Sequence, residues 1–137
     1  MILADTSAWI EYDRGTGSRV HLRLRDLVGG ADRLVVTEPV LMEILTGATT
    51  AAREKALRGL LLRFDFVPFV AAMDFDGAAE VYRRCRASGI TPRGLVDCMI
   101  ATVALRVGAS VLAHDADFAR IASVIGLELD QASLRSS

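Results

Sequence analysis

The sequence has little of several features that would indicate a secreted, membrane-bound or zinc-binding protein. It has only two cysteines, Cys85 and Cys98, which are too few for a disulfide framework or a zinc site. Both fall in helical patterns, so we expect free buried thiols in a reducing cytosol. No apolar run reaches the roughly 18 residues that a membrane helix needs. The chain starts on a strand-like run without a basic region or a cleavage site, so we expect no signal peptide and a cytoplasmic protein.

The sequence also lacks an excess of charge of either sign. Its net charge of -1 excludes a globally basic nucleic-acid binder, although it allows a local basic surface. Lysine is almost absent, because Lys55 is the only lysine among 16 basic residues. Arginine suits bidentate contacts with phosphate, but a codon bias explains the arginine content equally well. The two histidines, His21 and His114, are too few and too far apart to indicate zinc.

The composition is that of an ordinary globular domain. With 137 residues, 52% hydrophobic and 24% charged, the chain fits one domain over residues 1–137. Short apolar runs alternate with helical patterns, which predicts an α/β fold with a parallel sheet covered on both faces. We predict strands at 1–5, 33–36, 64–68, 110–113 and, in short form, 127–129. We predict helices at 8–12, 20–28, 39–46, 50–62, 74–88, 95–107 and 118–125.

Carboxylates stand beside or inside apolar runs at four places: Asp5, Glu43, Asp97 and the pair Asp115 and Asp117. Most of them have a structural explanation, with Asp5 as a helix N-cap, Glu43 as a solvated helix residue and the pair as turn residues. Asp97 is the hardest to explain in this way. A first-turn acid gains roughly 0.3–1 kcal/mol from the helix dipole, whereas a buried ion costs several kcal/mol.

The predicted sheet offers a way to bring these acids together. Sites in such sheets form outside the carboxyl ends of the strands. Asp5 and Asp115 end two predicted strands, Glu43 follows a third within two helical turns, and Asp97 lies near a helix start. Two like charges about 4 Å apart repel by roughly 4 kcal/mol at an effective dielectric near 20. Mg²⁺ or Mn²⁺, which take oxygen ligands, would reverse that sign, so the pattern predicts a hard-cation site.

Four stretches of the sequence, in this order and spacing, resemble the PIN domain and, within it, the VapC toxins of bacterial toxin–antitoxin pairs. They are residues 1–10, 38–45, 97–101 and 114–118. The resemblance implies a three-layer α/β/α fold with a central parallel sheet of about four to five strands. One departure is Ala113, where many relatives carry Ser or Thr, which puts one supporting hydrogen bond in doubt.

The resemblance assigns the catalytic acids to Asp5, Glu43, Asp97 and Asp115, with Asp117 in the same pocket. We expect metal ligation by Asp5 and Asp97 together with Asp115 or Asp117, a choice that the sequence leaves open. Glu43 is either a further ligand or the base that orients the attacking water.

The supporting hydroxyls of the family fall on Thr6 and Ser7. The resemblance implies an endoribonuclease in which Mg²⁺ or Mn²⁺ polarises the scissile phosphate and activates a water. The implied substrates are structured RNAs such as loops of tRNA or rRNA, and the implied products carry 5′-phosphate and 3′-hydroxyl ends.

Basic residues near the acids are candidate RNA contacts. Arg14 and Arg93 lead this group, although a solvated helix face is the favoured explanation for any single arginine. Trp9 could stack on an unpaired base, with core or dimer packing as the favoured alternative. Weaker candidates are Arg19, Arg23, Arg25, Arg83, Arg84 and Arg86.

The resemblance also implies partners. VapC-like proteins pair with a small antitoxin whose tail typically fills the active-site groove. We therefore expect a VapB-type antitoxin, a homodimer, and a heterotetramer or larger assembly with that antitoxin. DNA contact is expected only through the antitoxin, and no contact with a membrane is expected.

Two other functions are alternatives to the nuclease. A phosphatase of the haloacid dehalogenase type needs a second acid two residues after the first and a supporting lysine. The sequence Asp5-Thr6-Ser7 lacks that acid, and Lys55 is the only lysine. A non-catalytic module is the other alternative. A phosphoacceptor receiver needs a mid-chain Asp and a later lysine that are not well placed here, and a degenerate PIN domain would usually have lost acids.

Overall fold

A computed structural model describes residues 1–135. Its centre is a four-stranded parallel sheet in the order β3-β2-β1-β4. The strands are β1 (Ile2–Ala4), β2 (Leu34–Val36), β3 (Asp65–Phe66) and β4 (Ser110–Leu112). This confirms the predicted parallel sheet. The predicted strand at 127–129 is reduced to one isolated bridge between Val111 and Leu129.

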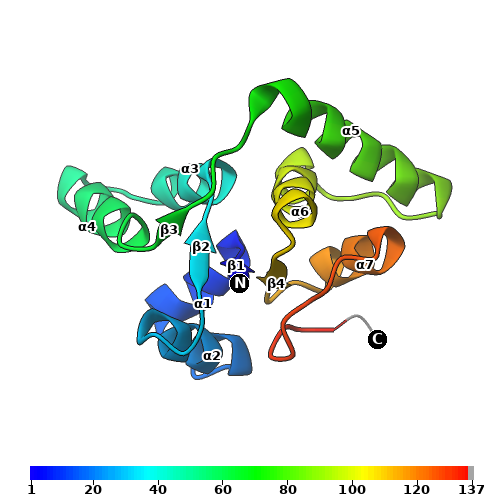
Figure 1. The fold of residues 1–137 in the computed structure, drawn as a ribbon. Helices are drawn as coiled ribbons and strands as arrows, with labels where there is room; N and C mark the ends of the chain where they lie inside the picture. The colour runs from blue at the N-terminus through cyan, green and yellow to red at the C-terminus, as the bar shows by residue number, and fades with distance from the viewer. Residues whose placement is uncertain (136–137) are drawn as a thin grey trace.

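Helices cover both faces of the sheet and give the three layers that were predicted (Figure 1). Helices α1 and α2 lie on one side, and α3 and α6 lie on the other. Within residues 1–135 the helices are α1 (Thr6–Arg14), α2 (Arg19–Val28), α3 (Glu38–Thr46), α4 (Ala51–Leu61), α5 (Ala71–Ala87), α6 (Leu95–Val107) and α7 (Ala116–Ile125). None of the helices in this range is both long and apolar enough to cross a membrane.

Three helices begin two or three residues earlier than the sequence predicts, because acids act on their first turns. Asp5 caps α1 by accepting a hydrogen bond from the Ala8 N–H, and Asp115 caps α7 by accepting from the Asp117 N–H. The Asp74 carboxylate accepts from the N–H of Val70 at 2.7 Å, which secures the start of α5. Each acid satisfies a backbone donor that would otherwise be unpaired at a helix start.

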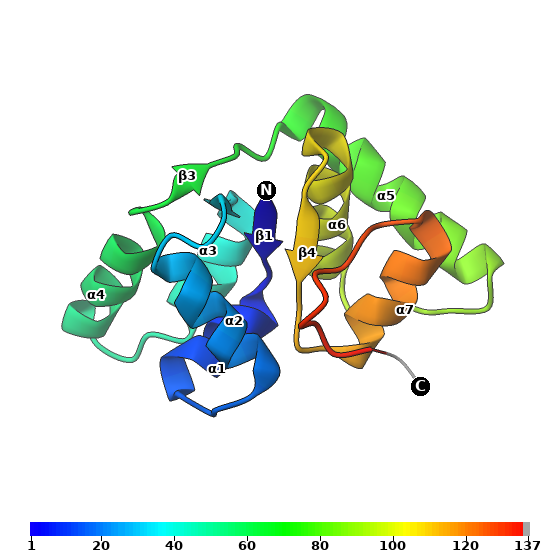
Figure 2. The ribbon, with the colours of Figure 1, turned by 60° about the horizontal axis from the view of Figure 1, so that its bottom comes forward.

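The core is apolar and continuous, and it fixes the strands that carry the acids. All three residues of β1 and β2 are buried, as short strands covered on both faces must be. Cys85 and Cys98 are buried and free, as predicted. Figure 2 shows the segment after α7 running back beside β4, where Asp130 donates its N–H to the Val111 carbonyl at 2.8 Å.

Candidate active site

A pocket of about 390 Å³ lies at the carboxyl ends of β1 and β4. Four acidic side chains line it, and each comes from a different part of the chain: Asp5 after β1, Glu43 on α3, Asp97 on α6 and Asp115 after β4. The remaining lining residues are Thr6, Ser7, Ile10, Arg93, Gly94 and Val96. The structure therefore brings together the four acids that the sequence singles out.

Asp5 is the most buried of these acids, with 2% of its surface exposed. Its Oδ1 accepts hydrogen bonds from Ser7 Oγ at 2.6 Å and from the Ala8 N–H at 2.9 Å. Burial raises the pKa of Asp5 to about 7, and the charges of Asp97 and Asp115 add to the rise against the two hydrogen bonds. Asp5 thus serves as a helix cap and also presents a carboxylate whose charge is poorly compensated.

Asp97 stands in the first turn of α6 and is partly buried. Burial is the largest cause that raises its pKa to about 6, followed by the negative charges of Asp115, Glu43 and Asp117. Arg93 acts in the opposite direction. The negative charges of these acids therefore repel one another. A bound cation would stabilise such a cluster because it reduces this repulsion.

Asp115 and Asp117 differ from the other acids because arginines already contact them. A terminal nitrogen of Arg93 lies 2.7 Å from Asp115 Oδ1 and 2.8 Å from Oδ2. The Nε of Arg93 lies 3.6 Å from Asp117 Oδ2, and its backbone N–H donates to the same oxygen at 3.3 Å. Arg120 lies 3.6 Å from the other oxygen of Asp117. Asp117 is thus next to the pocket and linked to it through Arg93.

The two hydroxyls that follow Asp5 each hold another part of the site. Thr6 Oγ1 donates a hydrogen bond to Glu43 Oε1 and so connects α1 with α3. Ser7 Oγ donates to Asp5 and accepts from the His114 N–H at 2.8 Å, which ties the start of α1 to the segment after β4. Both hydroxyls therefore orient acids of the pocket.

The donor set suits a hard cation in kind, because carboxylate and hydroxyl oxygens are the ligands that Mg²⁺ and Mn²⁺ prefer. Within residues 1–135, however, no three His, Cys, Asp or Glu side chains stand close enough together to hold one ion as arranged. Two of the acids have partners within the fold, because Asp115 faces Arg93 and Glu43 faces Thr6.

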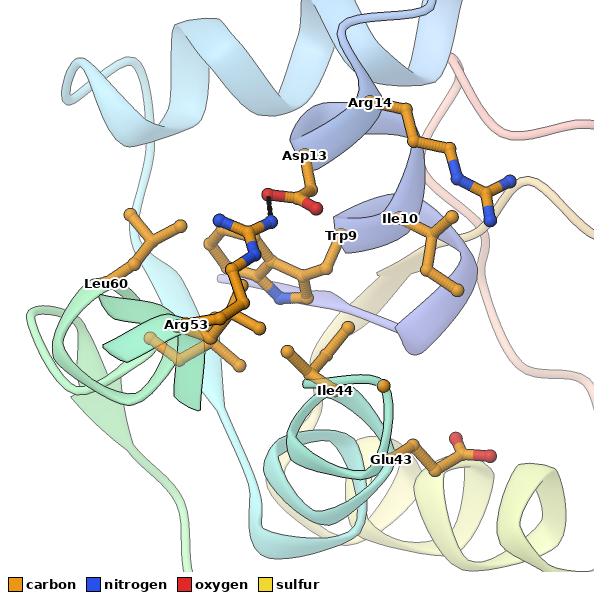
Figure 3. A pocket seen from close by; sticks show the side chains of 11 residues that line it. Trp9, Ile10, Asp13, Arg14, Glu43, Ile44, Arg53 and Leu60 are labelled. Carbon is orange, nitrogen blue, oxygen red and sulfur yellow. Dashed lines mark hydrogen bonds and ion pairs between the residues drawn. The ribbon is translucent and has the colours of Figure 1, made fainter. Parts of the chain in front are cut away.

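A second pocket of about 190 Å³, which has more apolar residues in its lining, adjoins the first, because Ile10 and Glu43 line both. Figure 3 shows the ion pair between Arg53 and Asp13 beside the Trp9 ring. Trp9 is only 1% exposed, so its ring offers no free face to an RNA base, and the core-packing alternative describes its position. Arg14 lines this second pocket rather than the acidic one.

The contacts that the sequence did not predict are those of Arg93 with Asp115 and Asp117. Arg93 was predicted as a phosphate contact because it precedes Asp97. Its position four residues before Asp97 was the only available signal, and a flexible side chain in a loop has no periodicity from which its partner can be read.

Comparisons with known proteins agree on one family. Residues 2–124 match the family model described as the PIN domain. The chain is 42% identical over 129 residues to VapC ribonuclease Mb1587 of Mycobacterium bovis and, equally, to ribonuclease VapC11 of Mycobacterium tuberculosis. Each alignment covers 93% of this chain and 96% of the relative.

A solved structure supports the same fold. The structure of VapBC2 from Rickettsia felis, bound to a DNA fragment from its promoter, superposes with a TM-score of 0.74. The match covers 95% of this chain and 98% of the other at 17% sequence identity. At this identity the superposition shows a shared fold.

Proposed function

Because the chain belongs to the PIN-domain family and, within it, to the VapC ribonucleases, we propose that it is a divalent-metal-dependent endoribonuclease acting as the toxin of a VapBC-type pair. The observation that carries this proposal is the meeting of Asp5, Glu43, Asp97 and Asp115 in one pocket. These four acids come from separated parts of the chain, and the pKa values of Asp5 and Asp97 are raised. Such a cluster of acids favours the binding of a cation.

Each acid has a role that follows from its surroundings. Asp5, Asp97 and Asp115 would hold the ion, with Asp117 as the alternative to Asp115. When bound, Mg²⁺ or Mn²⁺ supplies charge stabilisation at the scissile phosphate and an acidified water. Glu43, which accepts a hydrogen bond from the Thr6 hydroxyl, would accept a proton from the attacking water. Hydrolysis of this kind leaves 5′-phosphate and 3′-hydroxyl ends.

The substrate and partners follow from the relatives. The proposed substrate is cytoplasmic structured RNA, such as tRNA or rRNA loops, with Arg14 and Arg93 as phosphate contacts. The proposed partner is a cognate VapB-type antitoxin that neutralises the toxin, in an assembly built on a homodimer and contacting DNA only through the antitoxin. Support for this pairing comes from VapBC2 of Rickettsia felis, which was solved as a complex on promoter DNA.

The test is cleavage of total RNA by the purified protein with Mg²⁺, with Mn²⁺ and with EDTA. Asp5→Asn and Asp97→Asn should each reduce cleavage by about 100-fold or more, because each removes a charge that holds the cation. Asp76→Asn is the matched control, since Asp76 is an exposed acid on α5 that does not line the pocket. Cleavage by Asp5→Asn at the level of the Asp76→Asn control would refute the assignment.

A further inference from the structure

Among residues 1–135, Arg93 is the only basic side chain that lines the acidic pocket. It stands in the segment between α5 and α6, directly before Gly94, the residue that caps α6. Its terminal nitrogen lies within 2.8 Å of both oxygens of Asp115. The side chain of Arg93 is nevertheless 70% exposed. Its attachment to Asp115 and Asp117 is therefore ionic, with little packing to hold the side chain in place.

The arginine uses much of the hydrogen-bonding capacity of Asp115. Oδ1 accepts from both Arg93 and the Asp117 N–H, which lies 3.0 Å away, and these two bonds fill its two lone pairs. Oδ2 accepts from Arg93 and keeps one lone pair for another ligand. A divalent cation that shared this carboxylate with Arg93 would stand close to a second positive charge and be repelled by it.

We infer that Arg93 is a built-in competitor of the divalent cation: it neutralises Asp115 and Asp117 in the metal-free protein and leaves Asp115 when the cation binds. The inference deepens the proposed function and rests on it, because it takes the pocket as a cation site. The contacts support it from two directions. Arg93 occupies the carboxylate that the site needs, and its exposed side chain has little packing to keep it there.

The pocket also contains the reason why such a competitor is useful. Asp115 and Asp117 lie close to Asp97, and without a counter-charge these acids would repel one another. The guanidinium faces both acids at once, because one terminal nitrogen contacts both oxygens of Asp115 while Nε lies 3.6 Å from Asp117 Oδ2. A lysine has a single terminal nitrogen, so it would keep the charge, face fewer carboxylate oxygens and be a weaker competitor.

The experiment is calorimetric titration of the metal-free, full-length protein with MnCl₂ alone, comparing wild type, Arg93→Gln and Arg93→Lys. Arg93→Gln should bind Mn²⁺ about three- to five-fold more tightly, the size that release of an exposed ion pair allows. Arg93→Lys should fall between Arg93→Gln and wild type. Arg86→Gln is the matched control, because Arg86 is an exposed arginine on α5 outside the pocket, and its affinity should equal that of wild type.

Thermal unfolding provides a second readout that does not depend on activity. In EDTA, Arg93→Gln should unfold at a lower temperature than Arg86→Gln, since its acids lose their counter-charge. Saturating Mn²⁺ should then raise the unfolding temperature of Arg93→Gln more than that of wild type. An equal or weaker Mn²⁺ affinity in Arg93→Gln than in wild type overturns the inference and leaves the proposed nuclease intact. Absence of Mn²⁺ binding in every variant refutes the cation site itself and the inference with it.

Discussion

Asp5 and Asp74 each expose only 2% of their surface, although Asp5 lies deeper in the fold, and the pKa values of their carboxyl groups shift in opposite directions. At Asp74, burial raises the pKa, but hydrogen bonds from Arg106 and the Val70 N–H, together with the arginine's charge, bring it below the ordinary value. At Asp5, burial raises the pKa to about 7 and no arginine offsets it. Asp74 therefore has a cationic partner inside the fold, whereas no arginine is among the groups that shift the pKa of Asp5.

This difference distinguishes Asp74, which belongs to a structural ion pair, from Asp5, which is a candidate catalytic acid. Two nitrogens of Arg106 contact Asp74 at 2.8 and 3.0 Å, and one of them also donates to the Pro68 carbonyl at 2.7 Å. These bonds join the end of α6 to the start of α5. A buried charge that is fully paired contributes to architecture, whereas a buried charge with acidic neighbours and no cationic partner is available for chemistry.

The largest expected effect is on catalysis. Asp97→Asn should lower kcat/KM on RNA by about 100-fold, while its metal-free form should be as stable as wild type or more stable near neutral pH, because a repelled charge is removed. Asp74→Asn should show the reverse, with reduced stability and near-normal activity per folded molecule. The measurements are RNA cleavage and urea unfolding of both variants. Equal activity losses in the two variants would erase the distinction between the two acids.

The next effect is on stability. Arg106→Leu leaves Asp74 buried without its partner, so the free energy of unfolding should fall by about 3 kcal/mol, as for other broken buried pairs. Urea unfolding of this variant should be compared with Arg83→Leu, which changes an exposed arginine on α5. An equal loss of unfolding free energy in both variants would mean that the pair of Asp74 with Arg106 does not stabilise the fold.

A smaller effect is the dependence of stability on pH. The pKa values of Asp5 and Asp97 rise from 3.8 to about 7 and about 6, so the folded protein holds their protons more tightly than the unfolded chain does. Their stabilising contribution is complete below about pH 4 and is lost as the pH rises through 6 to 7. Asp74, with its lowered pKa, acts in the opposite sense and loses its contribution on acidification.

Urea unfolding in EDTA should therefore show a decline of about 2 kcal/mol between pH 6 and pH 7.5. Asp5→Asn should reduce the slope, since it removes the group with the higher pKa. Saturating Mn²⁺ should offset the decline in the wild-type protein. An identical slope in wild type and Asp5→Asn would show that Asp5 is not the group responsible.

The smallest predicted effect concerns the hydroxyl that holds Glu43. Thr6→Val removes one hydrogen bond, so kcat/KM should fall by roughly five-fold, the equivalent of about 1 kcal/mol. Thr49→Val, a change of an exposed threonine between α3 and α4, is the control and should leave kcat/KM unchanged. A Thr6→Val enzyme as active as this control would remove Thr6 from the set of positioning residues.

The sequence predicted the fold and the meeting of the acids because both depend on short-range patterns. Apolar runs fixed the strands, and the rule that sites form at strand ends placed Asp5 and Asp115 at one edge of the sheet. The first turns of α1, α5 and α7 were missed, because apolar periodicity does not show which acid caps a helix. The pairs of Asp74 with Arg106 and of Asp115 with Arg93 were missed for a related reason. They join residues 32 and 22 positions apart in the sequence. Only the folded structure shows which of the many arginines lies beside each acid.

The length and register of β1 determine where Asp5 lies in the site. Leu3 pairs with Val35 on one side and Val111 on the other, and the Asp5 N–H donates to the Leu112 carbonyl at 3.0 Å. One inserted residue in this strand would move Asp5 by about 3.3 Å and turn its side chain to the opposite face of the sheet. The loop at residues 15–18 is under no such constraint. Changes in chain length should therefore be tolerated there and excluded from the four residues before Asp5.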